Sequence, residues 1–123
     1  MQTPAEFIQE WLKRASSSDA EAIVSLYKED AILLGTLDAK VRKGRNEIRE
    51  YFEYFLTFHP CGKITSLIDE EVGNKTMAVA NGTYVFEINE GVKTTTLPAR
   101  FTFVLEKAGK NWEILSHHSS KQP

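Results

Sequence analysis

The spacing of apolar side chains changes along the chain from a helical period to an alternating one. Apolar residues recur every three or four positions in three early segments, which predicts helices over 3–15, about 18–27 and 45–58. From residue 63 onward apolar and polar side chains alternate, as is typical of strands. Strands are expected over 30–34, 64–72, 76–89, 94–107 and 112–119. Helices followed by strands predict a single α+β domain over 1–123, with three helices on one face of a curved antiparallel sheet.

Two of the helices begin with capping signals. Thr3 and Glu6 have the spacing of a capping box, and Pro4 suits the first helical position. Ser18 and Glu21 repeat the same spacing before the second helix. Two short helices joined by a few polar residues should lie against each other.

Both faces of the two longest strands carry apolar residues. Val79, Thr83 and Val85 alternate with Ala80, Tyr84, Phe86 and Ile88, and Arg100, Thr102 and Val104 alternate with Phe101, Phe103 and Leu105. Helices can cover only one face, and a bare apolar face would aggregate. We therefore expect a homodimer, or a larger ring, formed through the uncovered face. The covered face should enclose a ligand pocket in an open cone.

Composition and charge exclude several functional classes. The chain is 41% hydrophobic and 26% charged, as in an ordinary globular protein, and its net charge is −2. Basic and acidic residues are mixed along it, so we expect no nucleic-acid partner. No apolar run has the length of a membrane span, and the first residues lack the features of a secretory signal. The expectation is a cytoplasmic protein that does not bind membranes.

Single residues narrow the chemistry further. The lone cysteine, Cys61, rules out an internal disulfide and a multi-cysteine metal site. His117 and His118 are adjacent on a predicted strand, so their side chains leave opposite faces and cannot bind one metal ion together. We expect no metal and no cofactor.

Three segments carry a resemblance to a known family. They are 45–56 (RNEIREYFEYFL), 98–104 (PARFTFV) and 112–120 (WEILSHHSS). With them the chain resembles the nuclear transport factor 2-like superfamily, and within it the SgcJ/EcaC-type and SnoaL-like small proteins. These are similar to the association domain of calcium/calmodulin-dependent kinase II. The resemblance implies a conical α+β fold, a pocket in the cone, and dimers or rings built through the sheet. It does not imply one activity, because members include isomerases, cyclases, dehydratases, binding modules and scaffolds.

The resemblance also implies where the pocket lies. The pocket of the association domain is similar in position to Ile48, Tyr84, Phe103 and Ser119. The association domain has a histidine and three arginines there, and this chain has none of them. An acid-binding pocket of that kind is therefore not expected.

Five side chains are weighed as candidates for a role in the site. The family keeps a histidine at the position of His118, which is interpreted either as a pocket base or as a tie between the last strand and its surroundings. Arg100 either orients an anionic ligand or pairs with a carboxylate across a subunit interface. Tyr54 and Tyr84 either present hydroxyl groups to the pocket or serve as core or interface aromatics. Asp30 lies where some enzymes of the superfamily place a catalytic acid, although an aspartate there more often caps or turns the chain.

The function predicted first is a self-assembling module that binds an unknown small molecule, with no identifiable chemistry. Isomerase chemistry needs a desolvated carboxylate base facing an oxyanion donor, and no such pair can be placed in the sequence. The alternative is an acid–base enzyme of the isomerase, cyclase or oxidoreductase-associated kind that uses Tyr84, Arg100 and His118. A third hypothesis is a pure oligomerisation protein with a vestigial pocket.

Overall fold

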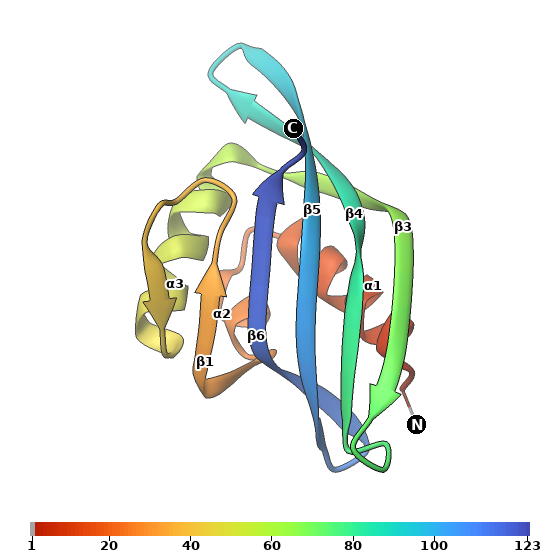
Figure 1. Cartoon of the computed structure of the whole chain (residues 1–123). Helices are drawn as coiled ribbons and strands as arrows, with labels where there is room; N and C mark the ends of the chain where they lie inside the picture. The colour runs from red at the N-terminus through yellow and green to blue at the C-terminus, as the bar shows by residue number, and fades with distance from the viewer. Residues whose placement is uncertain (1) are drawn as a thin grey trace.

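The structure, a computed structural model, describes residues 2–123 and confirms the predicted α+β cone. Three helices lie on one side of a curved six-stranded sheet (Figure 1). The helices are α1 (Pro4–Ala15), α2 (Ala20–Val24) and α3 (Arg45–Phe55), and α3 continues into a 3₁₀ turn (Leu56–Phe58). The strands are β1 (Tyr27–Leu34), β2 (Val41–Lys43), β3 (Cys61–Val72), β4 (Met77–Glu90), β5 (Lys93–Ala108) and β6 (Asn111–Lys121).

The two predicted capping signals have different outcomes. The Thr3 hydroxyl accepts a hydrogen bond from the backbone N–H of Glu6 at 3.1 Å, and the Glu6 carboxylate accepts one from the backbone N–H of Thr3 at 2.9 Å. This capping box is confirmed. At the second helix the cap is Asp19, which accepts from the backbone N–H of Glu21, and not Ser18. The second helix is also shorter than predicted, because the chain enters β1 soon after α2 ends.

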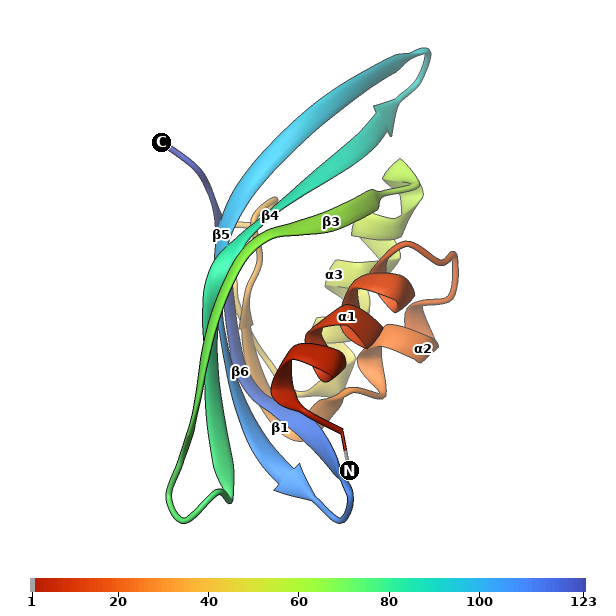
Figure 2. The same ribbon diagram turned by 90° about the vertical axis from the view of Figure 1, so that its right-hand side faces the viewer.

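The sheet has the order β2-β1-β6-β5-β4-β3. The four C-terminal strands pair with one another in an antiparallel manner, as predicted. Strand β1 pairs in parallel with β6, which brings a segment from the first third of the chain beside its C-terminal strand. The short strand β2, which pairs with β1, was not predicted. The hairpin between β4 and β5 extends beyond the other strands and bends toward the helix side (Figure 2).

A β-bulge in β6 decides which of its side chains face the helices. The pairing of β6 with β5 shifts between Ile114 and Ser116, so that Leu115 is an extra residue. One extra residue reverses the alternation of side chains along the rest of the strand. Ile114 is buried on the helix side before the bulge, and His117 and Ser119 are buried on the same side after it.

The core between helices and sheet is aromatic and is centred on Trp11. This side chain lies within 5.2–6.5 Å, between ring centroids, of five other rings. They belong to Phe52, Tyr84, Phe86, Phe103 and His117. Within residues 2–123 no helix combines the length and apolar character that crossing a bilayer requires.

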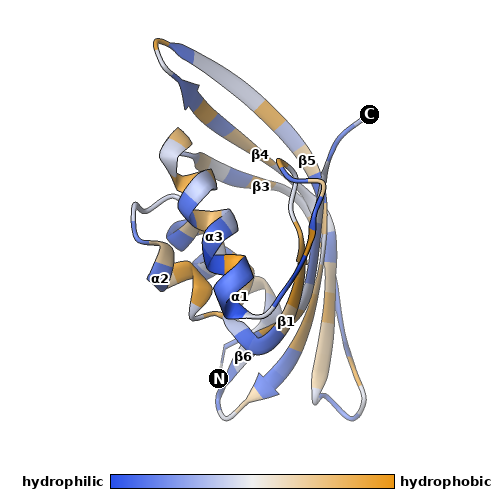
Figure 3. Ribbon diagram, turned by 90° about the vertical axis from the view of Figure 1, so that its left-hand side faces the viewer, coloured by the Kyte–Doolittle hydropathy of each residue, from blue (hydrophilic) through white to orange (hydrophobic). Residues whose placement is uncertain are grey.

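The opposite face of the sheet carries no helix, and apolar and polar positions alternate along its strands (Figure 3). Val79 of β4 pairs with Val104 of β5, and both are only partly covered. On the neighbouring strand β3, Ile68 is 73% exposed. The uncovered apolar positions expected on β4 and β5 are therefore present.

Candidate functional site

A small cavity lies between the helices and the sheet. Its space for the centres of water molecules is about 20 Å³, which is enough for one or two waters. The lining residues are Trp11, Leu33, Gly35, Thr36, Tyr51, Phe52, Phe55, Tyr84, Phe86, Leu97, His117 and Ser119. None of them carries a charge at neutral pH, and most are aromatic or aliphatic.

Six side chains, five of which line this cavity, form an unbroken series of hydrogen bonds, which we call the buried network. In order they are Trp11, Tyr27, His117, Tyr84, Ser119 and Thr36. The separations between successive bonded atoms are 3.1, 2.8, 3.3, 2.6 and 2.5 Å. Both ring nitrogens of the imidazole are used, Nδ1 toward Tyr27 and Nε2 toward Tyr84. Within residues 2–123 no buried polar side-chain atom lacks a partner.

The imidazole of His117 is enclosed by aromatic rings. It stacks on Phe103 with 3.8 Å between ring centroids and meets the edge of Trp11 at 5.2 Å. Desolvation of this kind disfavours the charged form of a histidine. Burial, helped by the neighbouring His118, lowers the pKa of His117 to about 3.

Burial acts on the tyrosines of the site in the same sense, by favouring the neutral form. It raises the pKa of Tyr27 and of Tyr84 well above the usual value for a phenol, and that of Tyr51 to about 12. The buried network is therefore uncharged throughout the physiological pH range. Such a wall offers hydrogen bonds to a ligand and no ionic contact.

The segment that follows β1 closes one end of the cavity. Gly35 packs on the ring of Tyr51 so closely that a Cβ atom there would lie 2.4 Å from the ring, which requires glycine. The Tyr51 hydroxyl accepts a hydrogen bond from the backbone N–H of Leu37 at 3.4 Å. Asp38 is paired with Arg42 at 2.5 Å. A few contacts therefore hold this segment over the cavity.

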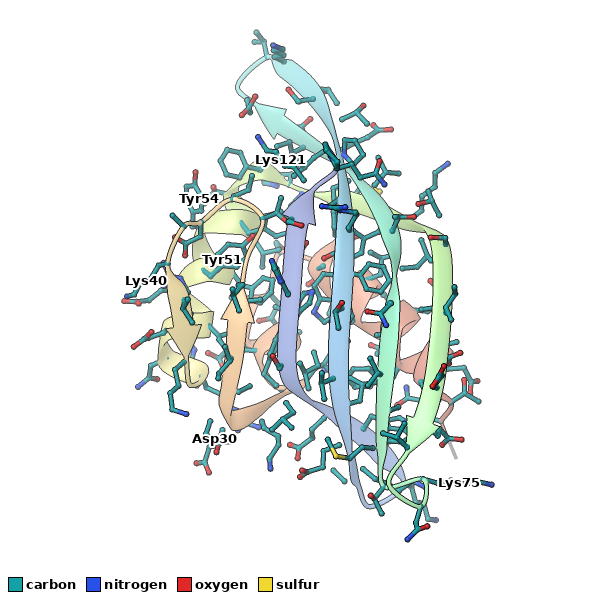
Figure 4. All side chains as sticks on the ribbon, in the orientation of Figure 1. Asp30, Lys40, Tyr51, Tyr54, Lys75 and Lys121 are labelled. Carbon is teal, nitrogen blue, oxygen red and sulfur yellow. The ribbon has the colours of Figure 1, made fainter. Side chains whose placement is uncertain are left out.

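A larger hollow lies on the outer side of the same segment. Its volume is about 370 Å³. The residues that line this outer hollow are Leu34, Gly35, Thr36, Asp38, Ala39, Lys40, His118, Ser119, Ser120 and Lys121. Lys40, before β2, and Lys121, at the end of β6, are labelled in Figure 4. Gly35, Thr36 and Ser119 line both the cavity and the outer hollow, so these residues lie at the boundary between the two spaces.

Three residues predicted for the pocket are in the interior. Tyr84 lines the cavity through its hydroxyl and ring. Phe103 is fully buried on the same face, but it lies behind His117 and does not reach the cavity. Ile48 is buried on the inner face of α3, also outside the cavity lining.

The other three predicted pocket residues do not reach the cavity, and their prediction as its lining is corrected. Arg100 and His118 are exposed on the outer face of the sheet, where they border a shallow depression of about 120 Å³. Their strand positions alternate with the buried ones, and the bulge at Leu115 moves His117 inward in place of His118. Tyr54 is 52% exposed, because it lies off the apolar stripe of α3, whereas Tyr51 lies between α3 and β1 (Figure 4). Asp30 is exposed on β1.

Sequence reasoning did not assign site roles to His117, Tyr27, Thr36 and Trp11. The adjacent histidines were correctly expected to leave opposite faces of the strand. However, His118 was predicted for the pocket, and it is His117 that lines the cavity. A count along the strand would not have identified the right one, because His117 becomes the cross-strand partner of Phe103 only through the bulge at Leu115. Tyr27 was taken as a helix residue. Within residues 2–123 no three histidine, cysteine, aspartate or glutamate side chains gather as a metal site requires.

Comparisons with known proteins give a consistent picture. A model of a family described as the SnoaL-like domain matches residues 5–123. A solved structure from Xanthomonas campestris, assigned as a calcium/calmodulin-dependent protein kinase II association domain, is 34% identical with a TM-score of 0.91. The match covers 97% of this chain and 85% of that one.

Two more distant structures share the fold. One, from Novosphingobium aromaticivorans, is assigned as a scytalone dehydratase, with 12% identity, a TM-score of 0.85, and coverage of 97% of this chain and 81% of that one. The other, from Streptomyces avermitilis, is assigned as a dehydratase, with 14% identity, a TM-score of 0.83, and coverage of 94% and 92%. No curated protein sequence matches the chain.

The depressed pKa of His117 predicts a loss of stability in weak acid. A pKa of about 3 in the folded protein, against about 6.5 in the unfolded chain, means that the unfolded state binds the proton first. The contribution is complete above about pH 6.5 and falls as the pH drops toward 3, by roughly 1.4 kcal/mol per pH unit. Urea unfolding at pH 6.5 and pH 5 should therefore show a loss of about 2 kcal/mol.

The adjacent histidine provides the matched control. His118→Gln should keep most of this loss, because burial is the larger cause of the lowered pKa of His117. His117→Gln should be less stable than the unaltered protein at pH 6.5. Its free energy of unfolding should fall much less between pH 6.5 and pH 5. Equal pH dependence in the two variants would contradict the assignment.

Proposed function

Because the chain belongs to the SnoaL-like domain family, within the nuclear transport factor 2-like superfamily, we propose that it is a self-associating protein that binds an uncharged small molecule inside its cone. The observation that supports this most directly is the uncharged cavity lining, in which aromatic rings surround a few hydroxyl groups. Such a composition is typical of small-molecule sites. A charged group in the cavity would lose its hydration and meet no opposite charge there, because the charged side chains Asp38, Lys40 and Lys121 line only the outer hollow.

The site that we propose comprises the cavity and the outer hollow. The cavity by itself is large enough only for water. The outer hollow has the volume of a small-molecule site, on the order of 300 Å³ or more. The two would merge when the segment that begins at Gly35 moves outward, because Gly35 and Thr36 of this segment line both spaces. The contacts that hold the segment, such as the hydrogen bond from Leu37 to Tyr51, are few enough to be exchanged for ligand contacts.

An acid–base enzyme is the second candidate. The contact between Tyr84 and His117 favours it, as do the dehydratase assignments of two structures that share the fold. General acid–base catalysis works best when the catalytic pKa is near the working pH. The pKa of His117 is about 3, that of Tyr84 is raised, and no carboxylate lines the cavity. Of the three residues expected for this chemistry, only Tyr84 lines the cavity, which places binding ahead of catalysis.

Self-association through the bare sheet face is the other part of the proposal. The paired Val79 and Val104, together with the exposed Ile68, give this face an apolar strip without a covering helix. A two-fold axis would bury the strip against its own copy. The association-domain assignment of the relative at 34% identity agrees with this. A protein that only assembles, with an unused cavity, would share this interface and differ in ligand binding.

Binding should discriminate against charge. Acetophenone and benzoate have the same ring and nearly the same shape, but only benzoate is an anion at pH 7. We expect acetophenone to shift the backbone amide NMR signals of Leu33, Gly35, Thr36 and Tyr84, and to bind at least about tenfold more tightly than benzoate, because burying an unpaired carboxylate costs several kcal/mol. Benzoate binding of equal strength, or the absence of any shift with millimolar acetophenone, would refute the proposed site.

Val104→Glu should dissociate the proposed dimer, because a buried, unpaired carboxylate in an apolar interface is costly. Light scattering should give twice the chain mass of 13.9 kDa for the unaltered protein and the single chain mass for the variant. Val92→Glu, at the fully exposed tip of the β4–β5 hairpin, is the matched control and should leave the mass unchanged. A folded, unaltered protein that has the mass of one chain at micromolar concentration would rule the interface out.

A further inference from the structure

The buried network contains one more proton than it has hydrogen bonds. With a neutral imidazole, its six side chains carry six N–H and O–H protons in total, and they are joined by five hydrogen bonds. One proton is therefore left without a partner in the network. Its position depends on the direction in which the hydrogen bonds run.

Trp11 sets that direction, because an indole N–H can only donate. It donates to the Tyr27 hydroxyl, and the proton of this fully buried hydroxyl is donated in a hydrogen bond to Nδ1 of His117, because it would otherwise be left without an acceptor. Nδ1 then carries no hydrogen, and the single imidazole proton is on Nε2, which donates to Tyr84. Tyr84 in turn donates to Ser119. Every bond thus points away from Trp11.

The unpaired proton is consequently at the far end of the network, on Thr36 or Ser119. These two hydroxyl groups share one hydrogen bond and have two protons between them. Within residues 2–123 neither hydroxyl has a further acceptor. Both residues line the cavity and the outer hollow, at the boundary between them. A ligand that bridges the two spaces meets this free donor.

We infer that the site selects uncharged ligands that place an acceptor oxygen, such as a ketone, ester or ether oxygen, against Thr36 and Ser119. This inference rests on the proposed binding function. An acceptor oxygen pairs the free proton, whereas a hydrocarbon leaves it unpaired at a partly buried position, which is unfavourable. A ligand whose polar group is only a donor leaves the same proton unpaired. Trp11 acts as a positioning residue, since it fixes the direction without touching the ligand oxygen.

Two pairs of isosteric probes test the inference. Acetophenone and α-methylstyrene differ by a carbonyl oxygen in place of a CH₂ group, so their affinity ratio measures the worth of an acceptor. Indole and indene differ by an N–H in place of a CH₂ group, so their ratio measures the worth of a donor. In NMR titrations we expect acetophenone to bind about tenfold more tightly than α-methylstyrene, and indole no more than about twofold more tightly than indene.

The variants Trp11→Phe and Trp112→Phe test the role of direction. Without the indole donor of Trp11, the network can reverse and present an acceptor at Thr36, so the preference for indole over indene should rise severalfold. Trp112 donates to the backbone carbonyl of Gln2, outside the network, so Trp112→Phe should keep the original ratios. An unchanged indole preference in a folded Trp11→Phe variant would overturn the role of Trp11.

If Trp11→Phe does not fold, the two probe pairs measured on the unaltered protein still test the inference. Acetophenone and α-methylstyrene binding equally well would overturn the acceptor preference and leave the proposed binding function intact. An indole preference as large as the acetophenone preference would overturn the direction of the network. If neither acetophenone nor α-methylstyrene binds at millimolar concentration, the proposed function itself fails.

Discussion

Burying an imidazole among aromatic rings imposes the condition on which the rest of this structure depends, because both ring nitrogens then need partners inside the protein. His117 meets this condition with Tyr27 on one side and Tyr84 on the other. Tyr27 is available because β1 pairs in parallel with β6, an arrangement that joins distant parts of the chain. The imidazole thereby links the helix layer, through Trp11 and Tyr27, to the far edge of the cavity at Ser119.

The same burial explains why the site is neutral. Aromatic surroundings lower the pKa of His117 and raise those of the tyrosines, so hydrogen bonds replace charges along the whole wall. A neutral hydroxyl group can donate a hydrogen bond in either direction along the network. An indole that only donates, at one end of the network, makes all the hydrogen bonds point away from it. An uncharged wall with a free donor at its mouth favours binding of an uncharged ligand over proton transfer at neutral pH. Arg100 and His118, which were expected in the cone, are instead on the outer face of the sheet, which is the face proposed for self-association.

Much of the fold could be predicted from the sequence, because it depends on local periodicity. The three helices, the four long C-terminal strands, the capping box at Thr3 and the two-sided apolar pattern of β4 and β5 all follow from spacing alone. The parallel contact between β1 and β6 depends on pairing between distant segments, which local patterns do not record. The strand β2 pairs with the nearby β1, but its three residues are too few to show a period.

The site was harder to predict for a specific reason. One extra residue, Leu115, switches which side chains of β6 face the helices, and a bulge has no strong signal in a sequence. Without the bulge His118 would face the cavity, and with it His117 does. Tyr84, which the family resemblance placed in the pocket, does line the cavity, and its strand β4 pairs with β5 without interruption. Thr36 could not be identified, because it lies in an irregular segment that only the folded structure brings beside Ser119.

The protonation of the His117 ring tests the central claim most directly. A long-range ¹H–¹⁵N correlation spectrum of the ligand-free protein at pH 5 distinguishes the two neutral tautomers from the cation. A neutral, directed network requires the proton on Nε2, with Nδ1 unprotonated, at a pH where an ordinary histidine is mostly charged. Signals from a doubly protonated ring, or from a ring protonated on Nδ1 alone, would contradict it.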